Sequence, residues 1–182
     1  RDLAASLAVL EPAHASPLLP EVAEAIARAV GGELRLVSGE MVLARADGST
    51  LESALMAEGH RKLALLIYLV RHRIIEAGGA LFWDEPEANL NPAAVRLIAA
   101  ALYALAQGGT QVILATHSLF LLREFEVLAA QQPMQVPTRY FALGFGKKGV
   151  TVSTSTDLAD VDPLVLLDED LAQSDRFIET SK

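Results

Sequence analysis

Hydrophobic and polar positions follow different spacings along the first half of the chain, and each spacing predicts a different element. The segment "PEVAEAIARAVGG" at 20–32 opens with a proline and acids and closes with two glycines, which predicts a helix. Residues 33–46 alternate in type around "SGE", which predicts a β-hairpin. Helical spacing then returns from Leu51 or Glu58 up to Ala77, before the next pair of glycines. We therefore expect an accessory hairpin between two helices.

The middle of the chain carries two continuously apolar runs separated by a helical segment. The runs are "ALFWD" at 80–84 and "TQVILATH" at 110–117, and both predict buried strands. The segment between them predicts a helix over 92–107, and "SLFLLREF" at 118–125 predicts another. Apolar strands that alternate with helices are typical of a parallel sheet covered on both faces. The sequence thus predicts an α/β fold.

The two ends of the chain carry weaker signals. Residues 1–20 contain three prolines and predict a short helix followed by an irregular connection. Near the other end, "RYFALGFG" at 139–146 predicts a strand, and "KKGVTVSTS" predicts its hairpin partner. The tail from Asp157 is acidic and predicts partial helix.

Composition restricts the class of protein. The chain has 182 residues, of which 52% are hydrophobic and 21% charged, which suits one globular domain. A net charge of -8 does not favour binding to nucleic acid or to a membrane surface. There is no cysteine, which excludes disulfides, thiolate metal sites and cysteine nucleophiles. No apolar run is long enough to span a bilayer, and we expect a cytoplasmic protein without a membrane partner.

Polar residues with useful chemistry follow both predicted strands. Asp84 and Glu85 lie at the end of the first strand, and His117 lies at the end of the second. In a parallel sheet, ligands bind beyond the carboxyl ends of the strands. One acid can hold Mg2+, the second can accept a proton from water, and a histidine can contact a phosphate. "DEP" alone also fits a polar turn, but the order of strand, acids, helix, strand and "THS" favours metal-assisted hydrolysis of a phosphoanhydride.

These segments carry a family resemblance. "LFWDEPEANLNP" followed by "VILATHS" resembles the Walker B, D-loop and switch-histidine segments of ABC-type ATPases. The chain looks most like AAA/ABC ATPases with an OLD-like or SMC-like head, including AAA_21-type ATP-binding proteins, over Gly31 to Phe141. The resemblance implies a P-loop NTPase-type parallel sheet flanked by helices, with the hairpin as an accessory. It implies that Asp84 holds the metal, that Glu85 is catalytic and that His117 is the switch histidine.

The resemblance also implies residues that contact nucleotide or a partner subunit. Asn89 and Asn91 fall in the D-loop, which touches the partner in this family. The segment "LMAEGHRKLALLIYL" stands where the signature segment lies, so that Gly59 matches the signature glycine. Its neighbours Glu58, His60 and Arg61 would act with it on ATP bound to the opposite subunit. The segment departs from the "LSGGQ" of transporters, which disfavours a transporter, and a plain helix N-terminus also explains "AEGHRK".

No G-x-x-x-x-G-K-[ST] phosphate loop occurs in the sequence. Together with the absence of an initial Met, this leads us to expect the C-terminal part of one ABC-type ATPase domain, which alone would be inactive. Its parts would be a helix and hairpin, the signature helix, the Walker B to switch core, and a hairpin with an acidic tail (1–50, 51–79, 80–145 and 146–182). A phosphate loop from another chain and a degenerate ATPase that only binds a partner remain open.

The function expected from these features is ATP binding and hydrolysis with Mg2+. The resemblance implies a homodimer of heads, joined through the signature and D-loop segments around ATP, in a bacterial defence or DNA-repair type of system. The alternative is a non-hydrolysing module that senses nucleotide and controls a partner nuclease or toxin. An effector protein (a nuclease or a toxin) and DNA stay open as alternative partners.

Overall fold

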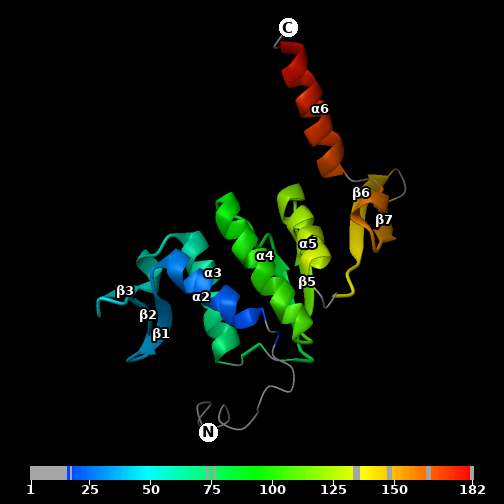
Figure 1. The fold of residues 1–182 in the computed structure, drawn as a ribbon. Helices are drawn as coiled ribbons and strands as arrows, with labels where there is room; N and C mark the ends of the chain where they lie inside the picture. The colour runs from blue at the N-terminus through cyan, green and yellow to red at the C-terminus, as the bar shows by residue number, and fades with distance from the viewer. Residues whose placement is uncertain are drawn as a thin grey trace.

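The computed structural model describes residues 16, 18–72, 74–75, 77–132, 136–146, 149–162 and 165–180. The short helix expected within residues 1–20 falls mostly outside them. Three helices surround the main core: α2 (Leu19–Val30), α3 (Glu58–Arg71) and α4 (Pro92–Gln107). Figure 1 shows α4 between the α2–α3 pair and the next helix, α5 (Leu119–Gln131). The large side chains of this core that are almost fully enclosed are Ile26, Leu43, Leu63, Leu66, Ile98, Leu102 and Leu121.

Helices α2 and α3 differ in how well the sequence predicts them. Helix α2 ends at Gly31, whose φ of 79° is left-handed and suits glycine, and the expected helix is confirmed. Helix α3 begins at Glu58 rather than at Leu51, and it ends at Arg71, before the expected Ala77. Beyond that end, the amides of Ile74 and Ile75 both donate to the carbonyl of Leu69 and do not continue the helical pattern.

Between α2 and α3 in the sequence, the chain forms a three-stranded antiparallel sheet. Its order is β1 (Glu33–Val37), β2 (Glu40–Ala44) and β3 (Thr50–Glu52). The hairpin is confirmed, but the third strand was not expected, and a 3-10 turn (Ser53–Leu55) joins it to α3. An ion pair of 2.6 Å between Arg71 and Glu33 connects the end of α3 to this sheet.

A second sheet pairs β4 (Ala80–Asp84) with β5 (Gln111–Ala115) in parallel. Leu81 and Trp83 face the helical core, where they are partly buried. The opposite face carries Phe82, 72% exposed, and Ile113, 41% exposed. Coverage of both faces was expected, and it is wrong for the residues that the structure describes. We call the surface formed by Phe82 and Ile113 the open face.

Helix α4 has a well-defined N-terminus. The side-chain oxygen of Asn91 accepts a hydrogen bond of 2.9 Å from the Ala94 amide, and Pro92 occupies the first turn. Both features are typical of helix starts, and the expected helix over 92–107 is confirmed.

The cap at Asn91 gives a stability prediction. Asn91→Ala removes an acceptor for an otherwise unpaired amide, so the free energy of unfolding should fall by about 1 kcal/mol in urea titrations. Asn91→Asp keeps a capping oxygen and should stay close to the native value. Equal losses for both variants would contradict a capping role.

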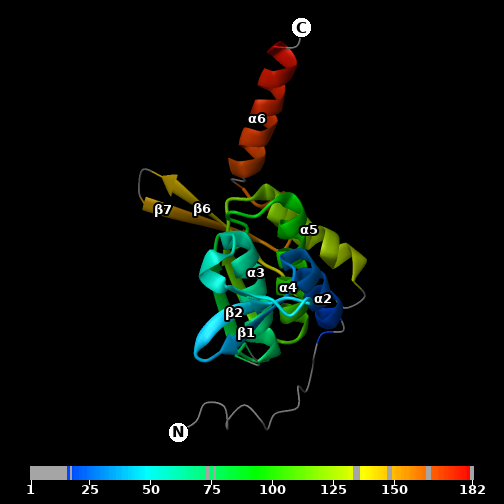
Figure 2. The ribbon, with the colours of Figure 1, turned by 90° about the vertical axis from the view of Figure 1, so that its left-hand side faces the viewer.

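The C-terminal region consists of a hairpin and a helix. Strands β6 (Tyr140–Gly146) and β7 (Gly149–Ser155) pair antiparallel, as the sequence predicts. A 3-10 turn (Leu158–Asp160) leads to α6 (Val165–Thr180), which extends away from the body in both views (Figures 1 and 2). Burial and the nearby carboxylate of Glu126 raise the pKa of Tyr140 to about 12, so its phenol is neutral at physiological pH. None of the helices that the structure describes is long and apolar enough to cross a membrane.

Candidate functional site

The parallel pairing of β4 and β5 brings two polar strand ends to one edge of the sheet. Asp84 is in register with Ala115, the last residue of β5. The amide of Glu85 continues the ladder and donates a 2.8 Å hydrogen bond to the Ala115 carbonyl. The loops that carry Glu85 and His117 therefore begin side by side.

Glu85 has an unusual backbone conformation. Its φ is 46°, in the left-handed region that a non-glycine residue seldom adopts. The next residue, Pro86, is fully buried, and the Ala88 amide donates a 3.1 Å hydrogen bond to the Glu85 carbonyl. These contacts hold the strained residue in place and leave its carboxyl group exposed. Strain of this kind is concentrated at functional sites, so Glu85 is the residue of the loop to examine for chemistry.

The strain at Glu85 predicts that a residue better suited to left-handed backbone geometry would stabilise the protein. Asn adopts left-handed geometry more readily than Glu, so Glu85→Asn should raise the free energy of unfolding by about 1 kcal/mol. Glu85→Ala is the matched control, because it removes the carboxylate but keeps the strained conformation. Urea unfolding distinguishes the two causes: if Ala stabilises as much as Asn, repulsion from Asp84 rather than backbone strain is responsible.

Asp84 lies on the open face of the sheet, two positions along β4 from Phe82. Its carboxyl group is exposed, and among the described residues it forms no hydrogen bond or ion pair. Among the residues that the structure describes, no group of three or more His, Asp or Glu could enclose a metal. Mg2+ does not need such a cage, because it is usually held by one or two carboxylates, water and substrate phosphates. Asp84, with Glu85 next to it, fits that oxygen chemistry.

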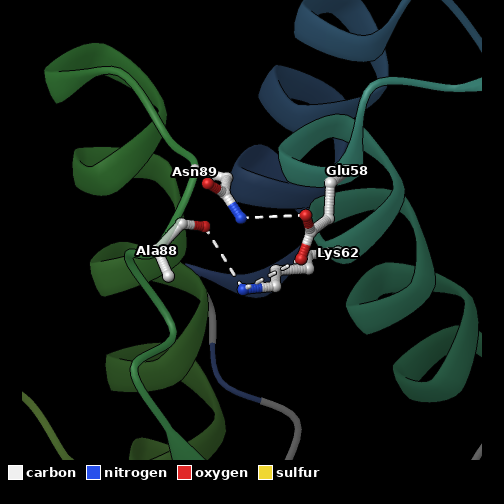
Figure 3. Close-up of polar contacts among 4 residues, drawn as sticks. All are labelled: Glu58, Lys62, Ala88 and Asn89. Atoms are coloured by element: carbon white, nitrogen blue, oxygen red, sulfur yellow. Dashed lines mark hydrogen bonds and ion pairs between the residues drawn. The ribbon is translucent and has the colours of Figure 1, made fainter.

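The loop after β4 contacts the start of α3 through the pair of interactions in Figure 3. The side-chain amide of Asn89 donates a 2.8 Å hydrogen bond to Glu58, and the Lys62 ammonium donates one of 3.2 Å to the Ala88 carbonyl. Lys62 also lies 3.9 Å from Glu58. Asn89 has a φ of 65°, a left-handed conformation that Asn tolerates. We call these four residues the latch. It joins the segment that matches the D-loop to the segment that matches the signature.

Gly59, next to Glu58 of the latch, is buried against Asn89 and Leu90. A Cβ at this position would lie 2.6 Å from the Asn89 carbonyl oxygen and 2.6 Å from the Leu90 side chain. Glycine is therefore required here by packing within the chain, whatever else its backbone contacts. The adjacent His60 and Arg61 are exposed. At the helix start, no side chain of the described residues caps α3 at Ala57, so its first amides are available to an acceptor.

Sequence reasoning did not single out Thr116. Its hydroxyl donates a 2.5 Å hydrogen bond to Glu87, which belongs to the loop after β4. Thr116 precedes His117 directly, so this bond connects the loop after β4 with the loop after β5. The pattern "ATHS" contains the threonine, but nothing in a single sequence indicates its partner.

A family comparison matches residues 20–123, more than half of the chain, to one protein family. The family is described as "AAA domain, putative AbiEii toxin, Type IV TA system". The chain belongs to this family. No curated protein sequence matches it.

Solved structures of SMC heads share the fold of this AAA-family chain. One comes from work on ATP-driven dimerisation and DNA-stimulated activation of SMC ATPases, and it has 18% sequence identity and a TM-score of 0.53. The match covers 82% of the present chain and 92% of the SMC chain. Another is the Pyrococcus furiosus Smc head with an extended coiled coil, bound to the C-terminal domain of ScpA, with 13% identity and a TM-score of 0.51. It matches 88% of this chain and 37% of its own length. A third, an Smc head bound to the winged-helix domain of ScpA, has 15% identity, a TM-score of 0.54, and coverage of 76% and 42%.

These matches confirm the resemblance drawn from the sequence. The chain has the mixed α/β fold of an AAA-type ATPase module, of the P-loop NTPase type. It spans less than half the length of two of the three structures.

Proposed function

We propose that this AAA-family chain supplies the metal, base and switch residues of a head that binds and hydrolyses ATP. The observation that carries the proposal is the parallel register of β4 and β5, which starts the loops of Glu85 and His117 at one edge of the sheet. Glu85 is exposed and strained there, as expected for a residue held for chemistry rather than for packing.

Each residue has a distinct role in the proposal. Asp84 holds Mg2+ through its free carboxylate, and bound Mg2+ would neutralise charge on the phosphates of ATP. Glu85 orients a water molecule and accepts its proton. His117 donates a hydrogen bond to the γ-phosphate, where negative charge develops during transfer.

The open face fits the missing phosphate-binding loop. Phe82 and Ile113 expose apolar surface on the same face as Asp84, which a strand and helix would cover in a P-loop fold. We propose that the segment bearing the phosphate loop packs there, supplied by the same polypeptide or by another chain. On this proposal residues 1–182 are one part of a larger ATPase domain.

A dimer of heads would place the start of α3 against nucleotide on a partner. The exposed Arg61 presents positive charge, and the exposed His60 and the uncapped amides of α3 present donors for phosphate. Asn91 is committed to capping α4, and Asn89 and Glu58 bind each other, so we assign these three to shaping the loop rather than to direct nucleotide contact. The SMC ATPase structure named for ATP-driven dimerisation supports this arrangement.

Nucleotide-dependent dimerisation tests the proposal. In the full-length protein, Glu85→Gln should bind ATP with Mg2+ and accumulate as a dimer in sizing chromatography, because hydrolysis no longer separates the heads. The matched control is Glu52→Gln, an exposed acid on β3 that should give no ATP-dependent dimer beyond that of the native protein. A Glu85→Gln protein that stays monomeric with saturating ATP would contradict the proposal.

The family description favours one second candidate, because it names a toxin and a toxin–antitoxin system. In that case the module senses nucleotide without hydrolysing it and controls a partner nuclease or toxin in the cytoplasm. Partner control that is indifferent to Glu85→Gln would favour this candidate. DNA-stimulated activation, named for the SMC ATPase, makes DNA the first effector to try.

A further inference from the structure

His117 lies at the apex of a short turn that is fixed on both sides by hydrogen bonds. On one side, the Thr116 hydroxyl accepts a 3.0 Å bond from the Ser118 amide. On the other, the Ser118 hydroxyl accepts a 3.2 Å bond from the Leu121 amide and caps α5. The Thr116 hydroxyl is therefore bonded to the backbone directly after His117.

The Thr116 hydroxyl is itself oriented by Glu87. Because that oxygen already accepts the Ser118 amide, its own proton points away, toward the Glu87 carboxylate at 2.5 Å. A backbone amide can only donate, so the Ser118 amide fixes the direction of both bonds and the hydroxyl donates to Glu87. The Thr116 hydroxyl thus connects Glu87 to the turn that carries His117.

The burial of Glu87 indicates that this contact is not incidental. Its second carboxylate oxygen is buried and has no hydrogen-bond partner among the residues that the structure describes. A buried unpaired acceptor is unfavourable, and a smaller or apolar residue would avoid that cost. The neighbouring Ala88 is held by Lys62 of the latch, so the backbone that carries Glu87 is also anchored to α3.

We propose that Glu87 is a positioning residue for His117, acting through Thr116 to fix the turn that presents the imidazole. This inference rests on the proposed function for its kinetic consequence, but not for its structural one. The proposal gives Glu87 a different role from Glu85. Glu87 accepts a hydrogen bond and takes no proton from water.

Kinetics of the full-length protein provide the first test. Glu87→Ala and Thr116→Val should each lower kcat by roughly 10- to 100-fold, with KM for ATP changed by less than about threefold, because a displaced group impairs the chemical step more than binding. The conservative variants Thr116→Ser and Glu87→Gln keep the donor and an acceptor and should recover most of kcat. Thr154→Val, an exposed site on β7, is the matched control for Thr→Val.

A second arm separates positioning from general stability. In a His117→Ala background, Glu87→Ala should lower kcat no further, because the imidazole that it orients is already absent. A further tenfold loss in that background, or a Thr116→Val protein with native kcat, would overturn the proposal.

A third arm does not need hydrolysis. In heteronuclear NMR, the imidazole resonances of His117 should shift in Glu87→Ala and Thr116→Val and return toward native positions in Thr116→Ser. If the native protein does not hydrolyse ATP but these shifts occur, the proposed function fails and the positioning role stands. Unchanged His117 resonances in both disruptive variants would overturn the positioning role, whatever the ATPase activity.

Discussion

Replacing Glu85 with glutamine is expected to lower the rate of ATP hydrolysis by the full-length protein by about 10²–10⁴-fold, the range lost with a general base. Glutamine has nearly the same shape but cannot accept a proton from the attacking water. The left-handed backbone and the 2.8 Å bond to Ala115 are main-chain features that the substitution leaves in place. Steady-state phosphate release, measured over a range of ATP concentrations, separates kcat from KM.

The result for Glu85 is informative only beside a matched acid. Glu52→Gln removes another exposed carboxylate, from β3 and outside the loop after β4, and should hydrolyse ATP at the native rate. If Glu85→Gln also retains native turnover, the proton acceptor is another group, and the strain at this position has a purely structural origin.

Gly59→Ala is expected to produce the largest loss of stability among the site variants. The added Cβ would meet the backbone carbonyl oxygen of Asn89 at 2.6 Å, and a backbone atom cannot rotate away as a side-chain end can. Overpacking of this kind costs about 1–3 kcal/mol, although alanine in a helix gains about 1 kcal/mol over glycine. We expect the close contact to outweigh the helical gain, and ATP turnover to fall because the loop after β4 is displaced from α3.

Urea unfolding with a neighbouring control measures this effect. His60→Ala changes the next, exposed position of α3 and should alter the free energy of unfolding by less than about 0.5 kcal/mol. A Gly59→Ala protein that is more stable than native would show that Asn89 and Leu90 move to accommodate the added Cβ at little cost. In that case the glycine would be required by something outside the chain, such as a phosphate.

The sequence predicts best those elements whose ends are marked locally. The strand at 80–84 is enclosed by glycines and a proline, and helix 92–107 has an asparagine cap and a following glycine, so both have the expected bounds. The apolar character of the strands predicted their parallel pairing, which in turn placed Glu85 and His117 at one edge. Local signals were enough to place Glu85 and His117 because parallel strands bring their carboxyl ends to the same edge of a sheet.

Contacts between distant residues could not be predicted in this way. Asn89 and Glu58 are 31 positions apart, and Thr116 and Glu87 are 29 apart, so no periodicity relates them. Leu51 was placed in a helix as one option because its pairing as a strand depends on β2, which single-sequence spacing does not show. The open face was likewise missed, since an apolar run indicates that a strand is suited to burial but not what covers it.

The open face also affects how these residues behave in solution. The small β4–β5 sheet has unpaired edges within the described part of the chain, and Phe82 and Ile113 add a bare apolar surface to them. Unprotected strand edges beside apolar side chains promote intermolecular pairing and precipitation. When produced without a covering segment, this polypeptide should aggregate as its concentration rises. A charged residue in place of Phe82 should reduce the aggregation and keep the protein in solution.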